Sequence, residues 1–302
     1  MEFFKHNTTI NFMAQRKITA VLSIVLCCAS FVILAINGLS WGLDFTGGTQ
    51  LQLRYEQAAD LTVIHQALEK VGFSDAIVTH YGTPKEILVS LAPKYAEKTL
   101  TALALTALPG ATLQEVNYIG PQVGQEMISK GLVAIIVALL GTMVYIALRF
   151  NIYFAVGSTV ALIHDPIIIL GVFSLLHIEF NLIALAAVLT VIGYSLNDTI
   201  VIFDRVRENF RKLHKTESAD VMNQAINQTL SRTIMTSALT LTVVLALFLL
   251  GGNALHGFAL ALMIGIVVGT YSSIYVAGSL TLALGLTREH FIPITKLVDD
   301  RP

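Results

Sequence analysis

Two ionisable residues lie in or beside apolar stretches of this sequence, and they are its clearest candidates for chemistry. Asp198 follows Asn197 in the segment GYSLNDT, and Arg232 stands at the polar edge of the next apolar stretch. A charge near the centre of a membrane helix costs about 2.5–3.5 kcal/mol or more, so such residues usually serve a function. Burial disfavours an ionised carboxylate, whereas a neighbouring guanidinium favours it. The spacing therefore predicts a proton site made by Asp198 and Arg232 with Asn197 beside it; the alternative is a fixed ion pair with Asn197 as a structural hydrogen-bonding residue.

A second ionisable pair, His164 and Asp165, lies within another apolar stretch, directly before Pro166. These two residues are weaker candidates for the same proton path. The histidine can instead bond a backbone carbonyl, and the aspartate can satisfy backbone groups that the proline leaves unpaired. Both readings stay open at this stage.

An enzyme is a further alternative, because Asp165 and Asp198 on neighbouring helices would suit an intramembrane aspartyl protease. The Gly-x-Gly-Asp signature of that class does not occur in the sequence. A cation near Asp198 would also keep it ionised, whereas a protease dyad shares a proton. The sequence holds no P-loop, nucleophile elbow, His-Glu-x-x-His motif or dinucleotide fingerprint. We expect no enzyme activity, no cofactor and no metal, with the proton as coupling ion.

Membrane helices are the elements that must position these residues. Hydrophobic residues make up 55% of the 302 residues and charged residues only 13%, against about a quarter charged in soluble proteins. The formal net charge of −1 provides no basic field for nucleic acid. A membrane helix needs about 20 apolar residues. Six stretches meet or approach this length: 18–36, 128–148, 152–176, 182–203, 234–250 and 258–286.

Lysine and arginine positions predict the orientation of these helices. If the N-terminus is cytoplasmic, the cytoplasmic segments hold most of the basic residues, including a cluster over 205–215, and the opposite short loops 176–181 and 251–257 hold none. The first apolar stretch is too long for the core of a cleaved signal peptide. We therefore expect an uncleaved anchor helix and two cytoplasmic termini. Small residues near every fourth position of the last stretch predict close helix packing: Gly265, Gly269, Ser272, Ser273 and Gly278.

Residues 38–126 interrupt the apolar pattern and predict an inserted domain on the extracytoplasmic side. Strand patterns at 49–55, 77–81, 87–91 and 112–119 alternate with helical patterns at 61–71 and 95–108. The order βαββαβ is that of a ferredoxin-like α+β unit. The chain then divides into a cytoplasmic N-terminus with the first helix (1–37), the inserted domain (38–126), a five-helix bundle (127–286) with an amphipathic cytoplasmic connector at 204–231, and a cytoplasmic tail (287–302).

Several motifs in this order resemble the SecD/SecF family. They are WGLDFTGG at 41–48, VIGYSLNDTIV at 191–201 leading into FDRVREN at 203–209, LSRTI at 230–234 and SSIYVA at 272–277. The resemblance runs nearly end to end, and the single insert and the chain length favour the shorter of the family's two subunits. The family motif after the first helix contributes five residues: Asp44, Phe45, Thr46, Gly47 and Gly48.

The resemblance implies a fold of the resistance-nodulation-division superfamily, in which six helices are half of a twelve-helix unit. It implies pairing with SecD in a bacterial inner membrane, beside the SecYEG channel, with YajC as an accessory and YidC as a further candidate partner. It implies that the proton-motive force helps to draw unfolded preproteins out at a late stage of export. The family's proton-pathway aspartate and arginine map onto Asp198 and Arg232.

Two other functions remain as alternatives to this one. A stand-alone exporter of small molecules or lipids from the same superfamily would need two copies of this chain to complete twelve helices. A passive scaffold of the export channel would carry the same membrane helices without using protons.

Overall fold

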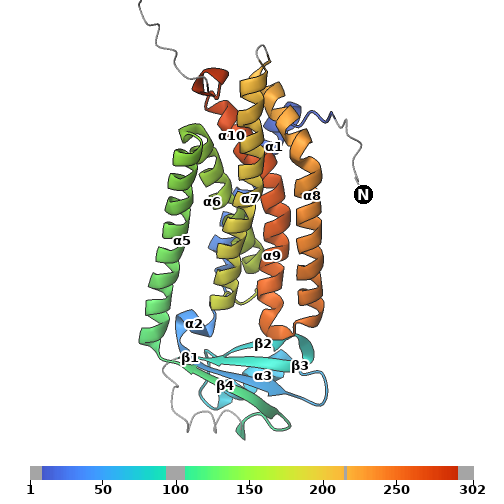
Figure 1. Ribbon diagram of the computed structural model, residues 1–302. Coiled ribbons are helices and arrows are strands. Elements are labelled where there is room, and N and C mark those ends of the chain that lie inside the picture. The colour runs from blue at the N-terminus through green and yellow to red at the C-terminus, as the bar shows by residue number, and fades with distance from the viewer. Residues whose placement is uncertain (1–8, 93–105, 214–215, 292–302) are drawn as a thin grey trace, which may run out of the picture.

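A bundle of long helices with a small sheet at one end forms the fold (Figure 1), and the computed structural model describes residues 9–92, 106–213 and 216–291. Six helical spans are long and apolar enough to cross a membrane, which confirms the six predicted stretches. The spans are α1 (Arg16–Asn37), α5 (Pro121–Arg149), α6 (Ile152–Leu175), α7 (Leu182–Lys212), α8 (Ser218–Leu250) and the continuous run of α9 (Asn253–Ser272), the π-helical turn η3 (Ser273–Ala277) and α10 (Gly278–Ala283). Short helical turns lie at η1 (Met13–Gln15), α2 (Leu43–Thr46) and η4 (Arg288–Phe291).

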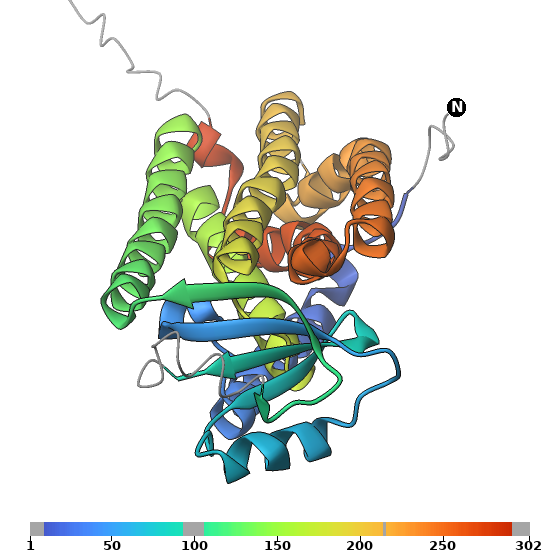
Figure 2. The ribbon, with the colours of Figure 1, turned by 90° about the horizontal axis from the view of Figure 1, so that it is seen from below.

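Helices α6, α7 and the last span form the centre of the bundle, and α1, α5 and α8 lie at its edge (Figure 2). About half of the apolar window is buried in α6, α7 and the last span (56%, 50% and 44%), against 17% in α1 and 11% each in α5 and α8. The outer helices therefore expose apolar side chains over much of their length, as expected of surfaces that face lipid or another membrane protein.

The connector predicted over 204–231 is not a separate element, because residues 204–212 continue α7 and residues 218–231 belong to α8. Glu208 supports the end of α7 through ion pairs with Arg205 (2.7 Å) and Lys212 (2.6 Å), one helical turn away on either side. The apolar residues that suggested a surface helix instead pack on one another in a single buried cluster with the bundle: Val206, Phe210, Val221, Ala225 and Ile226.

Glycines in α9 allow it to approach α7 closely, as the small residues of the last stretch predicted. A Cβ atom on Gly265 would collide with the side chain of Val191, and one on Gly269 would lie 3.1 Å from the Cβ of Ser195. Larger residues at these positions would push the two helices apart, because packed interiors leave no room for an added methyl group.

The inserted domain contains a four-stranded antiparallel sheet in the order β2-β3-β1-β4. Its elements are β1 (Gly48–Arg54), α3 (Leu61–Lys70), β2 (Ile77–Tyr81), β3 (Thr83–Leu91) and β4 (Thr112–Ile119). This strand order is the one expected of the predicted βαββαβ unit, whose second helix, predicted over 95–108, falls largely outside the described residues. The alternating residues Leu51 and Leu53 of β1 are fully buried with Leu68 of α3 in the core of this domain.

The segment 41–48 joins the sheet to the bundle at one crowded junction. The amide of Gly42 donates to the carbonyl of Phe180 (2.9 Å), and the amide of Phe180 donates to the carbonyl of Ser40 (2.7 Å), in the loop between α6 and α7. The rings of Trp41 and Phe45 contact the Phe180 ring with centroids 6.0 Å and 5.9 Å apart. The chain that follows the first helix is therefore held against the α6–α7 loop by both backbone and aromatic contacts.

The family-motif residues have distinct structural roles at this junction. The Asp44 carboxylate accepts a hydrogen bond from the amide of Leu182 (2.8 Å), at the N-terminus of α7, where unpaired amides and the helix dipole favour an anion. Gly47 and Gly48 adopt φ values of +66° and +122°, which side chains rarely allow. A Cβ on Gly48 would collide with the carbonyl oxygen of Leu91. The Thr46 hydroxyl donates to the carbonyl of Gly42 (3.3 Å).

Glu179 is a partly buried carboxylate at the same junction that the sequence pattern did not single out. The side-chain amide of Gln50, on β1, lies 3.4 Å from one of its oxygens, and the backbone of Leu43 also bonds it. Burial raises the pKa of Glu179 above its usual value; Gln50 and Leu43 act in the opposite direction, and the Asp44 carboxylate adds to the rise. Ionising Glu179 therefore costs free energy when the sheet is docked on the bundle.

We expect Gly48→Ala to destabilise the protein by about 2 kcal/mol or more, because the alanine adopts an unfavourable backbone conformation and displaces Leu91. Gly141→Ala, in the exposed middle of α5 with no atom within 4 Å of the added Cβ, is the matched control. It should be neutral or stabilising, since alanine is the better helix former by about 1 kcal/mol. Thermal unfolding of both variants in detergent tests this. Equal melting temperatures for the two would contradict the crowding at Gly48.

We expect the sheet–bundle junction to loosen as the pH rises through the elevated pKa of Glu179. A carboxyl group with a raised folded-state pKa stabilises the fold at low pH and loses that contribution as the pH increases. Glu179→Gln should abolish this pH dependence and keep the junction closed. Hydrogen exchange at the amides of Gly42 and Phe180, corrected for intrinsic rates from pH 4.5 upwards, measures it. Glu126→Gln, at the exposed Glu126–Lys130 pair, is the control and should behave as the unmodified protein does.

Candidate functional site

A polar layer separates two apolar clusters in the interior of the bundle. One cluster includes Phe154, Phe203 and Ile274, and the other includes Ile169 and Val191. Between them, each of the three central helical spans places polar side chains that are at most 5% exposed. These residues form the polar layer: His164 and Asp165 on α6, Ser195, Asp198 and Thr199 on α7, and Ser272 and Ser273 at the α9–η3 boundary.

Asp165 is the best-satisfied residue of the polar layer. One carboxylate oxygen accepts hydrogen bonds from the hydroxyls of Ser195 (2.7 Å) and Ser272 (2.9 Å). The other oxygen lies 3.0 Å from Nδ1 of His164. Asp165 is completely buried, so these donors, from three helices, replace the water that a carboxylate would otherwise bind. This arrangement makes Asp165 an anchor that ties the three central helices together.

The last span changes from α-helix to a π-helical turn at the polar layer. The Ser273 hydroxyl donates to the carbonyl of Gly269 (2.8 Å), and the Thr199 hydroxyl donates to Ser273 Oγ (2.9 Å). Adjacent serines thus bond to different helices, with Ser272 reaching Asp165 on α6 and Ser273 reaching α7. Single π turns inside α-helices occur frequently at functional sites.

Asp198, one helical turn along α7 from Ser195, contrasts with Asp165 on α6. It is only 3% exposed, and its Oδ2 atom is buried without a hydrogen-bond partner. Arg232 on α8 is the cation that interacts electrostatically with it, but among the described residues Asp198 makes no ion pair within 4.0 Å. Asp198 lies as many residues before the end of α7 as Arg232 lies after the start of α8, so the two residues share a similar depth, as the sequence predicted.

Arg232 and Asn197 both lie on the outside of the bundle. The two side chains are exposed, although their neighbours Thr233 and Asp198 are buried. The Thr233 hydroxyl is a second buried oxygen without a partner. The predicted proton site therefore stands at the boundary between the interior and the outer surface of α7 and α8. Asn197 makes no hydrogen bond to any described residue, and its predicted part in the site stays a prediction.

His164 connects the polar layer to the first helix. Its ring stacks on Tyr271 with centroids 6.3 Å apart, and its Nε2 atom is buried without a partner. The Tyr271 hydroxyl donates to the carbonyl of Thr19 (2.8 Å) and lies 2.9 Å from the Ser23 hydroxyl on α1. Polar contacts thus continue from Asp165 to α1.

The hydroxyl groups of the polar layer are candidate site residues that sequence reasoning missed. Ser272 and Ser273 were expected only to allow close packing, and Ser195 and Thr199 were not singled out. Ser195, Asp198 and Thr199 recur at positions i, i+3 and i+4, which places them on one helix face. That spacing is the signal from which they could have been found.

The geometry of the polar layer allows proton binding. A buried carboxylate without hydrogen-bond donors binds a proton readily, because protonation removes the cost of the buried charge. The neighbouring hydroxyls both donate and accept hydrogen bonds, so they suit the transfer of a proton through the layer.

Two family profiles match the chain. The family described as "Protein export membrane protein SecD/SecF, C-terminal" matches residues 100–287, which include the polar layer and Arg232. The "SecD/SecF GG Motif" matches residues 32–59, which include the glycines of the junction.

Relatives of this chain are similar over nearly its whole length. The protein translocase subunit SecF of Vibrio alginolyticus is 48% identical over 97% of this chain and 95% of its own length. That of Pseudomonas aeruginosa is 45% identical over 97% of this chain and 98% of its own.

The fold also matches solved structures. The crystal structure of SecDF, a translocon-associated membrane protein from Thermus thermophilus, superposes on 93% of this chain with a TM-score of 0.87 and 39% identity. The match spans only 39% of that longer chain. The crystal structure of SecDF in a super-membrane-facing form also superposes on 93% of this chain, with a TM-score of 0.70. By these matches the chain belongs to the SecD/SecF family of protein export membrane proteins, among its SecF members.

Proposed function

We propose that this protein is an accessory subunit of the Sec translocase, that it pairs with SecD, and that it uses the proton-motive force to promote late stages of preprotein export across the inner membrane. A transport component of this kind is not an enzyme. The relatives named as SecF translocase subunits and the similarity to SecDF support the translocase role. The observation that carries the proton-driven part is the buried Asp198, whose Oδ2 atom has no partner.

The outward-facing Arg232 and Asn197 support pairing with another helical unit. A guanidinium at a lipid-exposed position is costly, and membrane arginines almost always face protein or a water-filled cavity. A second six-helix unit on the surface of α7 and α8 would cover both residues. The SecDF chain, of which this chain spans 39%, supports SecD as that unit. Contacts with SecYEG, YajC and YidC stay predictions.

Two forms of SecDF support a conformational cycle. Both forms are 39% identical to this chain over the same share of it, yet they superpose with TM-scores of 0.87 and 0.70. The portion that corresponds to this chain therefore adopts different arrangements in the two forms. A charge moved through 100 mV is worth about 2.3 kcal/mol, so a few protons per cycle supply enough free energy to shift such an equilibrium.

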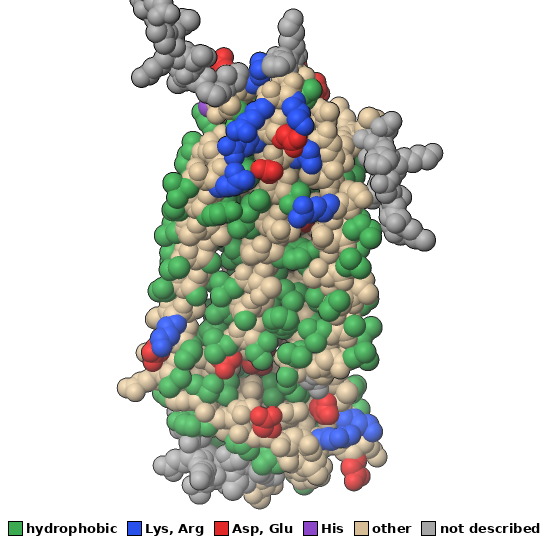
Figure 3. Space-filling model, viewed as in Figure 1, with side chains coloured by type: hydrophobic (Ala, Val, Ile, Leu, Met, Phe, Trp, Pro, Cys, Tyr) green, Lys and Arg blue, Asp and Glu red, His purple; other side chains and the backbone are tan. Residues whose placement is uncertain are grey.

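The distribution of basic residues supports an orientation with both termini in the cytoplasm. Lys and Arg side chains gather at the end of the bundle opposite the sheet, and apolar side chains dominate the middle (Figure 3). Cytoplasmic ends of membrane helices carry such an excess. The sheet then lies on the outer side, where an exported chain emerges.

We expect Asp198→Asn to remove the part of export that depends on the proton-motive force. Asparagine keeps the shape of the side chain but cannot bind and release a proton at neutral pH. Export of a preprotein into inverted vesicles at fixed SecA and ATP, with and without a protonophore, separates this part from the ATP-driven part. Asp204→Asn is the matched control, since Asp204 is also on α7 but 59% exposed in a loose 3.6 Å pair with Arg149. It should leave the protonophore response unchanged.

A protonophore response in Asp198→Asn equal to that of the unmodified protein would refute the proton site and leave the passive scaffold. Homodimers that export without SecD would instead favour the stand-alone exporter.

We expect Asp165→Asn to lower the thermal stability and to preserve the protonophore response, unlike Asp198→Asn. The amide must replace one carboxylate acceptor by a donor, which leaves part of the Ser195, Ser272 and His164 network unsatisfied and costs about 1–3 kcal/mol. A lower thermal stability with a preserved protonophore response would assign Asp165 and His164 to positioning the helices. Loss of the response at unchanged stability would place them on the proton path itself, where the sequence set them as weaker members.

A further inference from the structure

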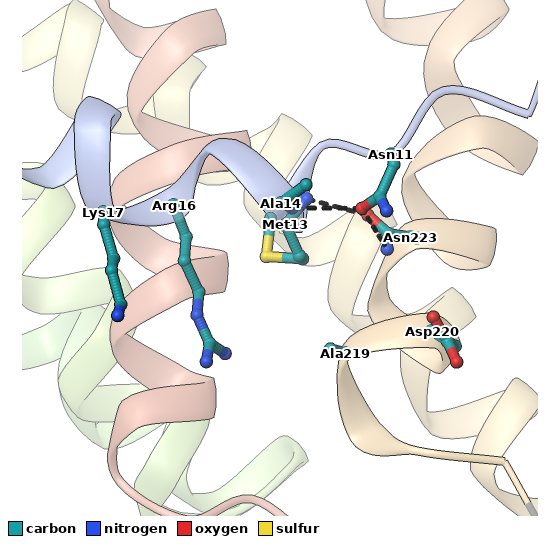
Figure 4. Close-up of a pocket in the computed structure, with 8 residues that line it drawn as sticks. All are labelled: Asn11, Met13, Ala14, Arg16, Lys17, Ala219, Asp220 and Asn223. Atoms are coloured by element: carbon teal, nitrogen blue, oxygen red, sulfur yellow. Dashed lines mark hydrogen bonds between the residues drawn. The ribbon is translucent and has the colours of Figure 1, made fainter.

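A cavity of about 400 Å³ opens between the segment that precedes α1 and the start of α8, at the end of the bundle opposite the sheet (Figure 4). Hydrogen bonds hold its upper wall in place. The amide of Met13 donates to Asn223 Oδ1 (2.9 Å), and Asn11 Oδ1 accepts from the amide of Ala14 (3.0 Å) and from Asn223 Nδ2 (2.9 Å). These hydrogen bonds hold the segment before α1 against the start of α8 and satisfy the amides of Met13 and Ala14.

Two cations and one anion line this cavity without pairing with one another. Arg16 and Lys17 extend side by side from the first residues of α1, and Asp220 faces the same space from the first turn of α8 (Figure 4). Within the described residues none of the three makes an ion pair within 4.0 Å. The cavity thus presents positive charge on one side and negative charge on the other.

The cavity lies where the headgroups of a bilayer would be. Arg16 and Lys17 are the last charged residues before the apolar span of α1. Below them, Ile18, Val21 and Leu22 are exposed by 74%, 61% and 47%, and such a surface is suited to acyl chains. A ligand in this position would have its polar part in the cavity and its apolar part along α1.

We propose that this cavity binds the headgroup of a phospholipid that carries both a phosphate and a primary ammonium group, as phosphatidylethanolamine does. Arg16 and Lys17 bind the phosphate through charge-assisted hydrogen bonds. Asp220 accepts hydrogen bonds from the ammonium group. A choline headgroup has no N–H to donate, and a glycerol headgroup has no charge to offer, so Asp220 selects between headgroups while the two cations bind any of them.

Native mass spectrometry of the full-length protein in detergent tests the proposal with added phosphatidylethanolamine, phosphatidylcholine, phosphatidylglycerol or inorganic phosphate. We expect the protein to retain phosphatidylethanolamine about tenfold more strongly than the other two lipids. Arg16→Gln with Lys17→Gln should weaken retention of all three about tenfold, whereas Asp220→Asn should remove only the preference for ethanolamine. Arg211→Gln, an exposed residue at the same end that does not line the cavity, should change nothing.

Three results would overturn the proposal. The first is equal lipid retention by the unmodified protein and by the doubly substituted variant. The second is displacement of lipid by inorganic phosphate alone, which would identify the cavity as a site for free phosphate. The third is an equal fall in melting temperature, in lipid-free detergent, for Asp220→Asn and for Arg16→Gln, which would indicate a direct pair between these residues. If the double variant does not fold, the comparison of lipid preference between the unmodified protein and Asp220→Asn still tests the proposal.

Discussion

The close approach of the last span to α7 is the contact on which the interior of this protein depends. With no side chain at Gly265 and Gly269, α9 lies against Val191 and Ser195, and this places Ser272 and Ser195 together on one oxygen of Asp165. In a bilayer no water is available to replace these partners, so each buried polar group needs one from the protein. A wider spacing between the two helices would leave Asp165 with a buried charge and too few donors.

The same contact gives Asp165 hydrogen-bond donors that the neighbouring carboxylate of Asp198 lacks. Asp165 has a hydrogen-bonding partner on each oxygen, and these partners connect three helices. Asp198 lacks a partner on Oδ2 and has its cation at the edge of the bundle, not in direct contact. Its charge state can therefore change with less rearrangement around it. The two environments therefore suit a structural role for Asp165 and the proposed proton-binding role for Asp198.

The sequence predicted those parts of the structure that depend on one physical rule at a time. Apolar length placed the six spans, and the alternation of apolar and polar residues placed β1. The prediction of a separate connector at 204–231 was wrong because its apolar residues pack on each other between α7 and α8. No pattern within one helix reports such a contact. Glu179 was missed for a related reason. It is partly buried where Gln50 of the sheet lies beside it, and residues so far apart in the sequence give no local pattern. Asp198 and Arg232 were predictable because a charge in an apolar run stands out, whereas serine and threonine hydroxyls in such a run do not.

Because α7 is one continuous helix, it can link the proposed proton site to the inserted domain. Asp198 lies in its middle, and its first amide, at Leu182, is bonded to Asp44 at the junction. At 1.5 Å per residue the two points are roughly 24 Å apart. A shift of α7 that follows a change of charge at Asp198 would move Asp44 and with it the paired segment 40–48, which continues directly into β1. Gly47 and Gly48 leave this segment no slack, because their neighbours Pro121 and Leu91 touch them closely. The tight junction would therefore carry the motion into the sheet, on the side where an exported chain would emerge.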